Sequence, residues 1–332
     1  MFHSVPLGWL VTIWGVLGWA WLGLVMSQGM NSREFMKREH SLVKPYQGSG
    51  FGIPNWDFQG STMVTGTHVR LTADTQSQQG AIWNRIPILM PNWELQVHFR
   101  VTGTTKDLFG DGFAIWYTRD RMENGPVFGS KDMFSGFAII ADTYSNHNGP
   151  HNHKHPYLSA MINNGTMSYD HDRDGTHTMI GGCEVKFRNM QHDTFLAVRY
   201  ENEVLTVSHD LENDRAWTQC LQVKDVKLPT GYYIGASATT GDLSDNHDII
   251  SMKVYEIDAT EEQLKEDRSH INPSSTFFQP PRDHVDDPKP SAMSGFKTFV
   301  LLLLGVLVCV GCLVGGIMIY QKQQDNSRKR FY

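Results

Sequence analysis

An apolar run over residues 137–141 ends in three oxygen-bearing side chains at alternate positions, Asp142, Tyr144 and Asn146. The run is short and contains β-branched and aromatic residues, so it predicts a buried strand that turns into a loop at its end. A hard cation such as Ca²⁺ takes about six to eight oxygens from carboxylates, amides and main-chain carbonyls. A strand end that presents such oxygens on one side therefore predicts a metal site on a β scaffold.

Two further acidic groups lie beside glycine at expected strand ends. Asp111 lies between two glycines, directly before an apolar strand, and those glycines allow an unusual backbone there. A polar loop at residues 170–175 carries three aspartates and ends in glycine. One Asp-Gly pair is most often simply a turn. Three such groups at strand ends in one domain favour a binding site.

Strand-like segments dominate the middle of the chain. Residues 93–101 alternate apolar and polar side chains, which is typical of a half-buried antiparallel strand. Further strands are expected at residues 112–118, 137–141, 195–200, 204–208, 232–237 and 249–257, with Glu201 and Asn202 as a hairpin turn. Because no helical periodicity is sustained, we predict an all-β fold, a sandwich of two antiparallel sheets.

The C-terminal part of the chain predicts a membrane anchor. Residues 299–320 carry no charge, and at ~1.5 Å per residue they span a hydrocarbon core of ~30 Å. Basic residues follow, from Lys322 to Arg330, so the positive-inside rule places the tail in the cytosol. We therefore expect a single transmembrane helix at residues 296–320, a cytosolic tail at 321–332 and a main domain that faces the lumen.

The remaining boundaries follow from composition. Residues 7–25 are apolar and precede small residues, which predicts a signal peptide at 1–29, with an uncleaved signal anchor as the alternative. Residues 30–257 would form the luminal domain. Residues 258–295 are charged and rich in proline, so we expect a stalk there.

Charge and cysteine usage agree with a luminal domain. The net charge of −6 is mild and offers no basic face for nucleic acid. Cys183 and Cys220 are the two cysteines outside the membrane segment, and in an oxidising compartment they predict a disulfide worth roughly 3–4 kcal/mol. Cys309 and Cys312 lie in the span, where small apolar side chains explain them better than a redox pair.

These segments together resemble a known family. Gly-Asp-Gly before a strand, followed by an apolar run and Asp142-Thr-Tyr144-x-Asn146, is similar to the leguminous-type (L-type) lectins. Residues 111–120, 125–132, 241–248 and 328–332 resemble the animal L-type cargo lectins of the early secretory pathway. The resemblance covers about residues 38–257 plus the span and tail. It implies a concanavalin-like sandwich that binds high-mannose N-glycans with Ca²⁺.

The resemblance also implies roles for individual residues. The Ca²⁺ ligands would be Asp142, the main-chain carbonyl of Tyr144, Asn146 and Asp174. The mannose contacts would be Ser77, Asp111, Asn146, His171, Gly241, Asp242 and Leu243. Fixed acceptors and donors of this kind suit sugar hydroxyls. The ion would fix the loop that carries Asn146, and thereby order the sugar site without touching the sugar.

Departures from the plant pattern refine the metal and aromatic assignments. Plant lectins hold a transition metal with a glutamate two residues before the strand-end aspartate, and here that position is Ile140. We therefore predict one Ca²⁺ site and no Mn²⁺ site. The rings of Tyr144 or Phe113 would pack on a sugar face, although core packing explains Phe113 equally well.

Four histidines, His147, His151, His153 and His155, follow the calcium donors. A solvated loop is the plain interpretation. A pH sensor is the sharper hypothesis, in which protonation between about pH 7 and 6 places positive charge beside Ca²⁺ and releases the glycan. A transition-metal site is a third alternative.

Two short motifs bear on processing and transport. Asn164 begins an N-glycosylation sequon in the expected luminal domain. At the C-terminus, Phe331 and Tyr332 resemble an aromatic signal for export coats, and Arg328, Lys329 and Arg330 resemble a basic retention or retrieval signal. A topology anchor is the alternative for the basic residues.

The sequence therefore predicts a Ca²⁺-dependent lectin for high-mannose glycoproteins, a cargo or quality-control receptor in the membranes of the endoplasmic reticulum, the intermediate compartment or the Golgi, which contacts coat proteins through its tail. We expect no enzyme, because a glycosidase needs two carboxylates about 5–10 Å apart and no Glu-x-Asp-x-Glu strand pattern is present. A receptor that has lost sugar binding and uses protein contacts is the second alternative. Asp111, Asn146 and His171 argue against it.

Overall fold

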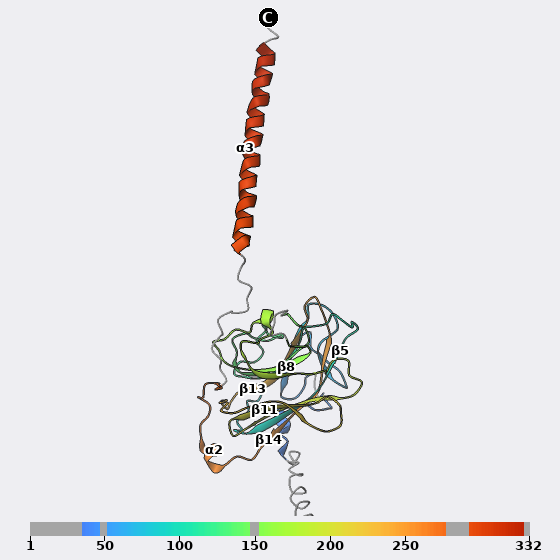
Figure 1. The fold of residues 1–332 in the computed structure, drawn as a ribbon. Helices are drawn as coiled ribbons and strands as arrows, with labels where there is room; N and C mark the ends of the chain where they lie inside the picture. Colours follow the sequence, from blue (N-terminus) through green and yellow to red (C-terminus); the bar gives the residue numbers. More distant parts are fainter. Residues whose placement is uncertain (1–34, 47–51, 147–152, 277–291, 329–332) are drawn as a thin grey trace, which may run out of the picture. The chain divides into compact units, whose positions relative to one another are not determined.

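The computed structural model describes residues 35–46, 52–146, 153–276 and 292–328 (Figure 1). The chain divides into two compact units, Met1–Pro281 and Arg282–Tyr332. The first unit holds the following elements: η2 (Arg38–His40), β1 (Trp56–Gly60), β2 (Met63–Val64), β3 (Val69–Thr72), β4 (Gln79–Asn84), β5 (Trp93–Thr102), β6 (Gly112–Thr118), β7 (Ser135–Asp142), β8 (Tyr157–Asn164), η3 (His171–Arg173), β9 (Met179–Glu184), β10 (Thr194–Glu201), β11 (Val204–Asp210), β12 (Thr218–Val223), β13 (Tyr233–Thr239), β14 (Asn246–Glu256) and α2 (Glu261–Lys265). The second unit holds α3 (Ala292–Arg328).

The strands form two seven-stranded antiparallel sheets. The first sheet has the order β1-β4-β13-β6-β7-β8-β9, and the second has the order β12-β11-β10-β5-β14-β3-β2. Strands distant in sequence pair in both sheets, for example β13 with β6 and β14 with β5. The two sheets form the layers of a sandwich, with β8 and β13 in one layer and β11 and β14 in the other (Figure 1). The predicted all-β sandwich is confirmed.

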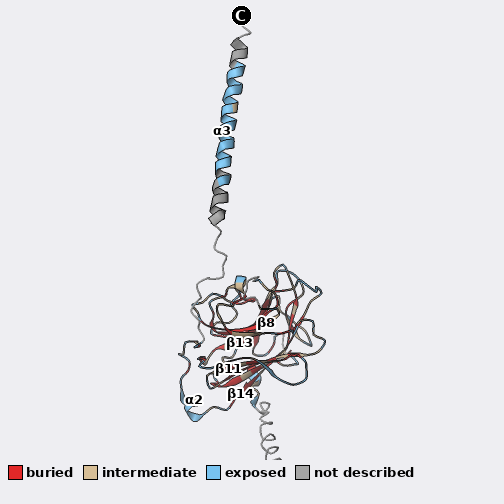
Figure 2. Cartoon of the chain, in the orientation of Figure 1, coloured by how far each residue is buried: buried red, intermediate tan, exposed pale blue. Residues whose placement is uncertain are grey.

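The first sheet is buried on both faces. Its inner face and the second sheet enclose the main apolar core, which includes Phe99, Phe113 and Val198. Its other face carries a second apolar cluster around Trp83 and Trp116, covered by residues such as Phe128 and Phe134 from the loop between β6 and β7. Every residue of β6 and β7 is therefore buried, and Figure 2 shows β8 and β13, two other strands of this sheet, largely in the colour of buried residues. Burial on both faces explains why these strands read as continuous apolar runs.

The expected strands occur with small changes at their ends. Residues 93–101 form β5, whose side chains alternate between buried and more exposed positions as the sequence predicts. The hairpin turn predicted at Glu201 and Asn202 is wrong by one residue, because Glu201 pairs with Val204 and leaves Asn202 and Glu203 as the loop. Both loop residues have positive φ, 51° and 61°, as a two-residue type I′ turn requires.

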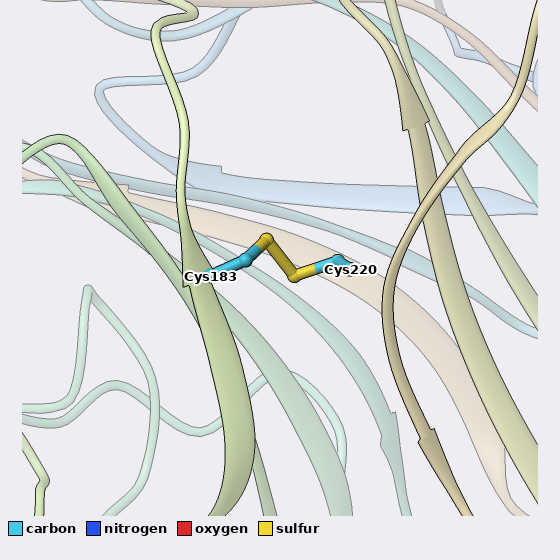
Figure 3. The surroundings of a disulfide bond; sticks show 2 residues. All are labelled: Cys183 and Cys220. Atoms are coloured by element: carbon cyan, nitrogen blue, oxygen red, sulfur yellow. A yellow bond between two sulfur atoms is a disulfide. The ribbon is translucent and has the colours of Figure 1, made fainter.

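A disulfide joins the two sheets. Cys183 in β9 and Cys220 in β12 are bonded, with their Cα atoms 5.4 Å apart (Figure 3). Since β9 and β12 are edge strands of different sheets, the bond closes one side of the sandwich. The predicted pairing is confirmed.

The domain extends beyond the boundary expected at residue 257. The short helix α2 begins with a capping box between Thr260 and Gln263. Arg268 is buried further along the segment, and Ser274 exchanges two main-chain hydrogen bonds with Lys227. Residues 258–276, expected as the first half of the stalk, therefore pack on the sandwich, where Arg268 pairs with Glu203 and Gln263 donates to Asn202.

The second unit contains a candidate membrane span. Leu303–Gln323 within α3 is long and apolar enough to cross a membrane, by length and composition. Cys309 and Cys312 are free thiols on the exposed surface of this helix. Arg328 is the last residue of α3, whereas the signal segment 1–29, most of the remaining stalk and tail residues 329–332 lie outside the described residues.

Candidate functional site

One end of the sandwich gathers the loops that carry the predicted site residues. At this end β7 finishes at Asp142, opposite Gly112 at the start of β6. Gly112 is in turn opposite Thr239 at the end of β13, so the loop after β13 lies beside both. The sheet pairing therefore brings the Asp111, Asp142 and Gly241 segments together, although about 130 residues separate the first from the last.

Two predicted metal ligands meet a histidine at this end. One ligand atom each from Asp142, His155 and Asp174 lie within 4.8 Å of one another. Both carboxylates are almost fully buried, with 6% and 3% of Asp142 and Asp174 exposed. Two oxygens that are each about 2.4 Å from one Ca²⁺ are at most about 4.8 Å apart, so the cluster has the right size for an ion.

The other two predicted ligands follow directly along the chain. The main-chain N–H of Tyr144 donates to Asp142 Oδ1 at 3.0 Å, and that of Asn146 donates to Asp174 Oδ1 at 2.9 Å. These bonds curl the loop around the carboxylates. Asn146 is exposed, so its side chain stands at the surface above the buried pair.

The loop that supplies Asp174 is a single turn of 3-10 helix, η3. Asp174 caps this turn in the left-handed conformation, with φ 51°, and donates its main-chain N–H to the carbonyl of His171 at 3.1 Å. The turn therefore fixes His171, a predicted sugar contact, relative to Asp174, a predicted metal ligand.

Buried polar atoms beside the carboxylates have no hydrogen-bond partner within the described part of the chain. They are both ring nitrogens of His153 and of His155, and the hydroxyl of Tyr169. His155 Nε2 lies 3.7 Å from Asp142 Oδ2 and 3.9 Å from Asp174 Oδ2. Unsatisfied buried polar groups are costly and rare, so the cluster fits a bound cation and its ligands.

The raised pKa values in the cluster also favour a bound cation. Burial raises the pKa of Asp142 to about 6, against the lowering effect of His155, and Asp174 adds to the rise. Burial alone would lower the pKa of His155, but the carboxylates of Asp142 and Asp174 outweigh it and the pKa is raised. A divalent cation would replace these protons as the compensating positive charge.

Asp111 faces the loop after β13. A Cβ added to Gly241 would lie 3.4 Å from Asp111 Oδ2, so the absence of a side chain lets the main chain of Gly241 approach the carboxylate. Gly112 has φ 144°, which a side chain would disfavour, as the flanking glycines predict. Burial, and then the negative charge of Asp242, raise the pKa of Asp111 to about 6.

The remaining predicted sugar contacts surround this carboxylate. Ser77 donates its main-chain N–H to the carbonyl of Gly241 at 3.0 Å, and Gln76 Nε2 donates to the carbonyl of Asp242 at 2.7 Å. The side chain of Leu243 lies beside Gly110, since a Cβ there would be 3.5 Å from Leu243 Cβ. These contacts join the Ser77 loop, the Asp111 segment and the Gly241–Leu243 loop into one wall of the site.

His171 forms another part of the site. Its Nε2 lies 2.9 Å from the carbonyl oxygen of Pro126, which only accepts, so Nε2 carries a proton. Its ring packs against Tyr169 and Phe128, with centroids 4.7 and 5.6 Å away. With this tautomer, Nδ1 is the ring nitrogen that can accept a hydrogen bond.

The structure decides between sugar packing and core packing for Phe113. Phe113 is 1% exposed and packs against Phe99 and Phe187 in the main core, so it is a core residue. Tyr144 is half-buried beside Gly110, and packing of its ring on a sugar stays a prediction.

Sequence reasoning missed several contributors. His155 is one of four clustered histidines, and nothing in the sequence indicates that it meets the Asp142–Asp174 pair. His147 and His151 lie outside the described residues. The clue is that Asp142 pairs with Tyr157 at the start of β8, which places the residue two positions earlier beside Asp142. Asp132, which accepts from the Tyr169 N–H at 2.9 Å and supports the 170–175 loop, ends one of the family-like segments, but the sequence assigns it no role.

Other predicted positions lie elsewhere. Asn164 is exposed at the end of β8, as glycosylation requires. Ile140 is fully buried in the second apolar cluster.

A two-sheet sandwich with buried carboxylates at one end of its strands is the architecture of the L-type lectins that the motifs resemble. The legume-like lectin family matches residues 33–263, more than half of the 332-residue chain. This chain therefore belongs to the legume-like lectin family.

Individual relatives extend the likeness over most of the chain. The chain is 52% identical to the vesicular integral-membrane protein VIP36 of Homo sapiens over 307 residues, 90% of this chain and 86% of that protein. It is 47% identical to the VIP36-like protein of Homo sapiens over 305 residues, with the same two shares. The solved exoplasmic/lumenal domain of VIP36 in its Ca²⁺/Man-bound form matches with a TM-score of 0.70 and 54% identity, over 74% of this chain and 99% of that one. The predicted family and concanavalin-like fold are confirmed.

Proposed function

We propose that this protein is a Ca²⁺-dependent lectin that binds high-mannose N-glycans and sorts glycoproteins in the early secretory pathway. The observation that carries the proposal is the convergence of the buried Asp142 and Asp174 carboxylates beside Asn146. These residues occur in a chain that belongs to a lectin family and is similar to VIP36, which has been solved with Ca²⁺ and mannose bound.

The ion would be held by Asp142, Asp174, the main-chain carbonyl of Tyr144 and Asn146. When bound, Ca²⁺ supplies the positive charge that lets both buried carboxylates ionise together. We expect one Ca²⁺ and no Mn²⁺, because Ile140 supplies no carboxylate. His155 is the third member of the cluster, and the pH-sensor hypothesis for the histidines stays a prediction.

The sugar would be held by groups that differ in chemical character. The Asp111 carboxylate offers two acceptors, the Asn146 amide offers its N–H donors while its oxygen faces the ion, and His171 Nδ1 offers an acceptor. The main chain of Gly241 and the side chains of Ser77, Asp242 and Leu243 complete the wall. This set suits adjacent hydroxyls of a mannose ring, which donate and accept at fixed spacing.

Metal and sugar sites are joined through two short paths. The Asn146 N–H bonds to Asp174, and η3 links Asp174 to His171. An ion that fixes Asp174 would therefore fix the two sugar-binding side chains on either side of it. The ion acts on affinity through the protein, and direct contact with the sugar is not required.

The proposed location follows from the candidate span. With Leu303–Gln323 in the membrane and the disulfide in an oxidising compartment, the lectin domain would be luminal and the protein a single-pass type I receptor. Its tail, including Arg328, Lys329, Arg330, Phe331 and Tyr332, would contact coat proteins as the receptor moves between the endoplasmic reticulum and the Golgi.

A glycan array tests the proposal most broadly. We expect the full-length protein to bind high-mannose glycans, to lose this binding in a chelator, and to lose it in Asp111→Ala. Asp258→Ala, an exposed aspartate in the segment after β14, is the matched control and should bind as the wild type does. Glycan binding that survives both the chelator and Asp111→Ala would overturn the lectin mechanism.

Two assays distinguish the lectin from the alternatives, a receptor that sorts by protein contacts and a glycan-processing enzyme. Absence of glycan binding together with retained partner capture would favour sorting by protein contacts. A hydrolysis assay on high-mannose glycans should show no turnover, and turnover would favour an enzyme.

A further inference from the structure

A buried arginine lies behind the wall of the proposed sugar site. Arg188 comes from the segment between β9 and β10, and its main chain forms a bridge with Val101 near the end of β5. Its side chain is 7% exposed and that of its partner Asp245 is 0% exposed. Burying an ion pair this deeply costs desolvation energy. The residues that contact Arg188 therefore indicate its structural role.

Arg188 contacts two separate loops of the proposed site. Its Nε lies 2.8 Å from Asp245 Oδ2, and its Nη2 lies 2.8 Å from Asp245 Oδ1, a bidentate pairing. The same Nη2 donates to the carbonyl of Thr105 at 2.9 Å, and the guanidinium carbon is 4.0 Å from the centroid of the Phe109 ring. Asp245 lies two residues after Leu243, and Phe109 lies two residues before Asp111.

Asp74 links a third loop to the same two. Its carboxylate accepts from Ser244 Oγ at 2.7 Å and from the main-chain N–H of Thr104 at 2.9 Å. Asp74 lies three residues before Ser77. The three loops that carry Ser77, Asp111 and Gly241–Leu243 therefore share one polar network, with Arg188 contributed from outside them.

We propose that Arg188 is a positioning residue for glycan binding, which fixes the Asp111 segment against the Gly241–Leu243 loop through Phe109, Thr105 and Asp245. This inference rests on the proposed mannose site. Arginine suits the role because its planar guanidinium pairs with a carboxylate through two hydrogen bonds while one face stacks on an aromatic ring. Loops held in the binding geometry lose less freedom when the ligand binds, and affinity rises for that reason.

The experiment compares two arginines of equal burial. Arg188→Met is set against Arg268→Met, because the Arg268 side chain is also 7% exposed and ion-paired but packs near Tyr200. Mannoside and Ca²⁺ affinities are measured by calorimetry on the full-length protein in detergent, with a high-mannose oligosaccharide as probe, well below the melting temperature of each variant. We expect Arg188→Met to weaken oligosaccharide binding at least about 10-fold, with Ca²⁺ affinity within about 2-fold. Arg268→Met should change neither affinity.

The outcomes distinguish this inference from the proposed function. If the wild type does not bind the oligosaccharide, the proposed function fails. If the wild type binds and Arg188→Met binds equally well, the positioning role is overturned. Equal weakening in both arginine variants, or a parallel fall in Ca²⁺ affinity, would also overturn it, because either would reflect general loosening or an effect through the metal.

Two further variants keep the test sharp if Arg188→Met does not fold. Phe109→Leu removes the stacked ring while keeping an apolar side chain, and should weaken oligosaccharide binding several-fold at unchanged Ca²⁺ affinity. Arg188→Lys keeps the charge but loses the bidentate pairing and the stacking, so it should rescue little of the affinity. Full affinity in Phe109→Leu would overturn the proposal.

Discussion

The two ends of the β-sandwich are built for opposite purposes. At the end where β7 finishes, the Asp111, Asp142 and Asp174 carboxylates lie buried or half-buried, and burial raises the pKa of Asp111 and Asp142. At the other end, beside the β10–β11 hairpin, Asn92 and Gln263 make their hydrogen bonds within the protein. Asn92 Nδ2 donates to the carbonyl of Asp258 at 3.1 Å, and Gln263 Nε2 donates to Asn202 Oδ1 at 2.8 Å.

On the proposed function, the residues at the site end bind ligands, and those at the other end stabilise the fold. Like charges that are buried together destabilise the protein unless a ligand compensates them. The hydrogen bonds of the opposite end need no external partner. Changes to the Asp111, Asp142 and Asp174 carboxylates should therefore alter ligand affinity at little cost in stability, and changes to the paired groups elsewhere in the sandwich should do the reverse.

The largest effect is expected from Asp142→Asn. Loss of one of two buried carboxylates should weaken Ca²⁺ binding by at least about 100-fold, and mannose binding should be lost with it. Because the repulsion between Asp142 and Asp174 is relieved, the melting temperature in chelator should stay the same or rise. Calcium calorimetry and thermal melting check both points, with Glu266→Gln at the opposite end as control. Ca²⁺ affinity within a few-fold of wild type would remove Asp142 from the metal site.

Removing the disulfide should lower stability and leave ligand affinity nearly unchanged, the reverse of Asp142→Asn. Replacing Cys183 and Cys220 by serine frees a loop with a sequence separation of 37, so the unfolding free energy should fall by about 4 kcal/mol on the chain-entropy model. Oligosaccharide affinity of the folded protein should stay within about 3-fold. Denaturant unfolding and calorimetry measure the two quantities. A large loss of affinity without a loss of stability would reverse the comparison.

The pH dependence of mannose binding should follow Asp111. Burial and Asp242 raise its folded pKa to about 6, so the carboxylate is ionised above that pH and accepts from sugar hydroxyls, and is neutral below it. From pH 7 to pH 5, affinity at saturating Ca²⁺ should fall by about 10-fold. The effect of pH on folding stability runs the other way. Because the folded pKa of Asp111 is raised, protonation favours the folded state at low pH, and this contribution is lost as pH rises through about 6.

Asp242→Asn sharpens the pH test. Removal of its negative charge should shift the midpoint of the affinity curve to lower pH, since one cause of the raised Asp111 pKa disappears. An affinity that does not change between pH 7 and pH 5 would exclude a role for ionised Asp111.

The smallest effect is expected at the capping box of α2. Thr260→Ala removes the side chain that accepts from the Gln263 N–H, and should lower the unfolding free energy by about 1 kcal/mol. Oligosaccharide affinity should not change. Thermal melting resolves the difference, and an unchanged melting temperature would show that residues 258–276 contribute little to the domain.

Strands with one buried face could be predicted from the sequence, and several strands with two could not. Residues 93–101 alternate because β5 has one face in the core. In contrast β4 and β8 are buried on both faces and mix small, polar and apolar residues. Their sequences therefore show neither the two-residue period of a half-buried strand nor the period of a helix. The start of α2 carries a capping box, yet its docking on the sandwich depends on Asn92 and Asn202, which local sequence does not reveal.

The site could be predicted where its residues adjoin a strand end. Asp111 and Asp142 flank recognisable strands, and family motifs supplied Asp174 and the Gly241 loop. The partners of Arg188 could not be predicted, because Asp245 is 57 residues away and meets it only once the strand order of the second sheet is known. His155 is an intermediate case, since its approach to Asp142 depends on the register between β7 and β8.

The central claim is that one ion orders the mannose site without touching the sugar. It is tested most directly by titrating Ca²⁺ into the full-length protein with and without a saturating high-mannose oligosaccharide. Because coupling between two sites is reciprocal, we predict that the oligosaccharide tightens Ca²⁺ binding by the same factor by which Ca²⁺ tightens oligosaccharide binding, at least about 10-fold. Equal Ca²⁺ affinities in the two titrations would contradict the account.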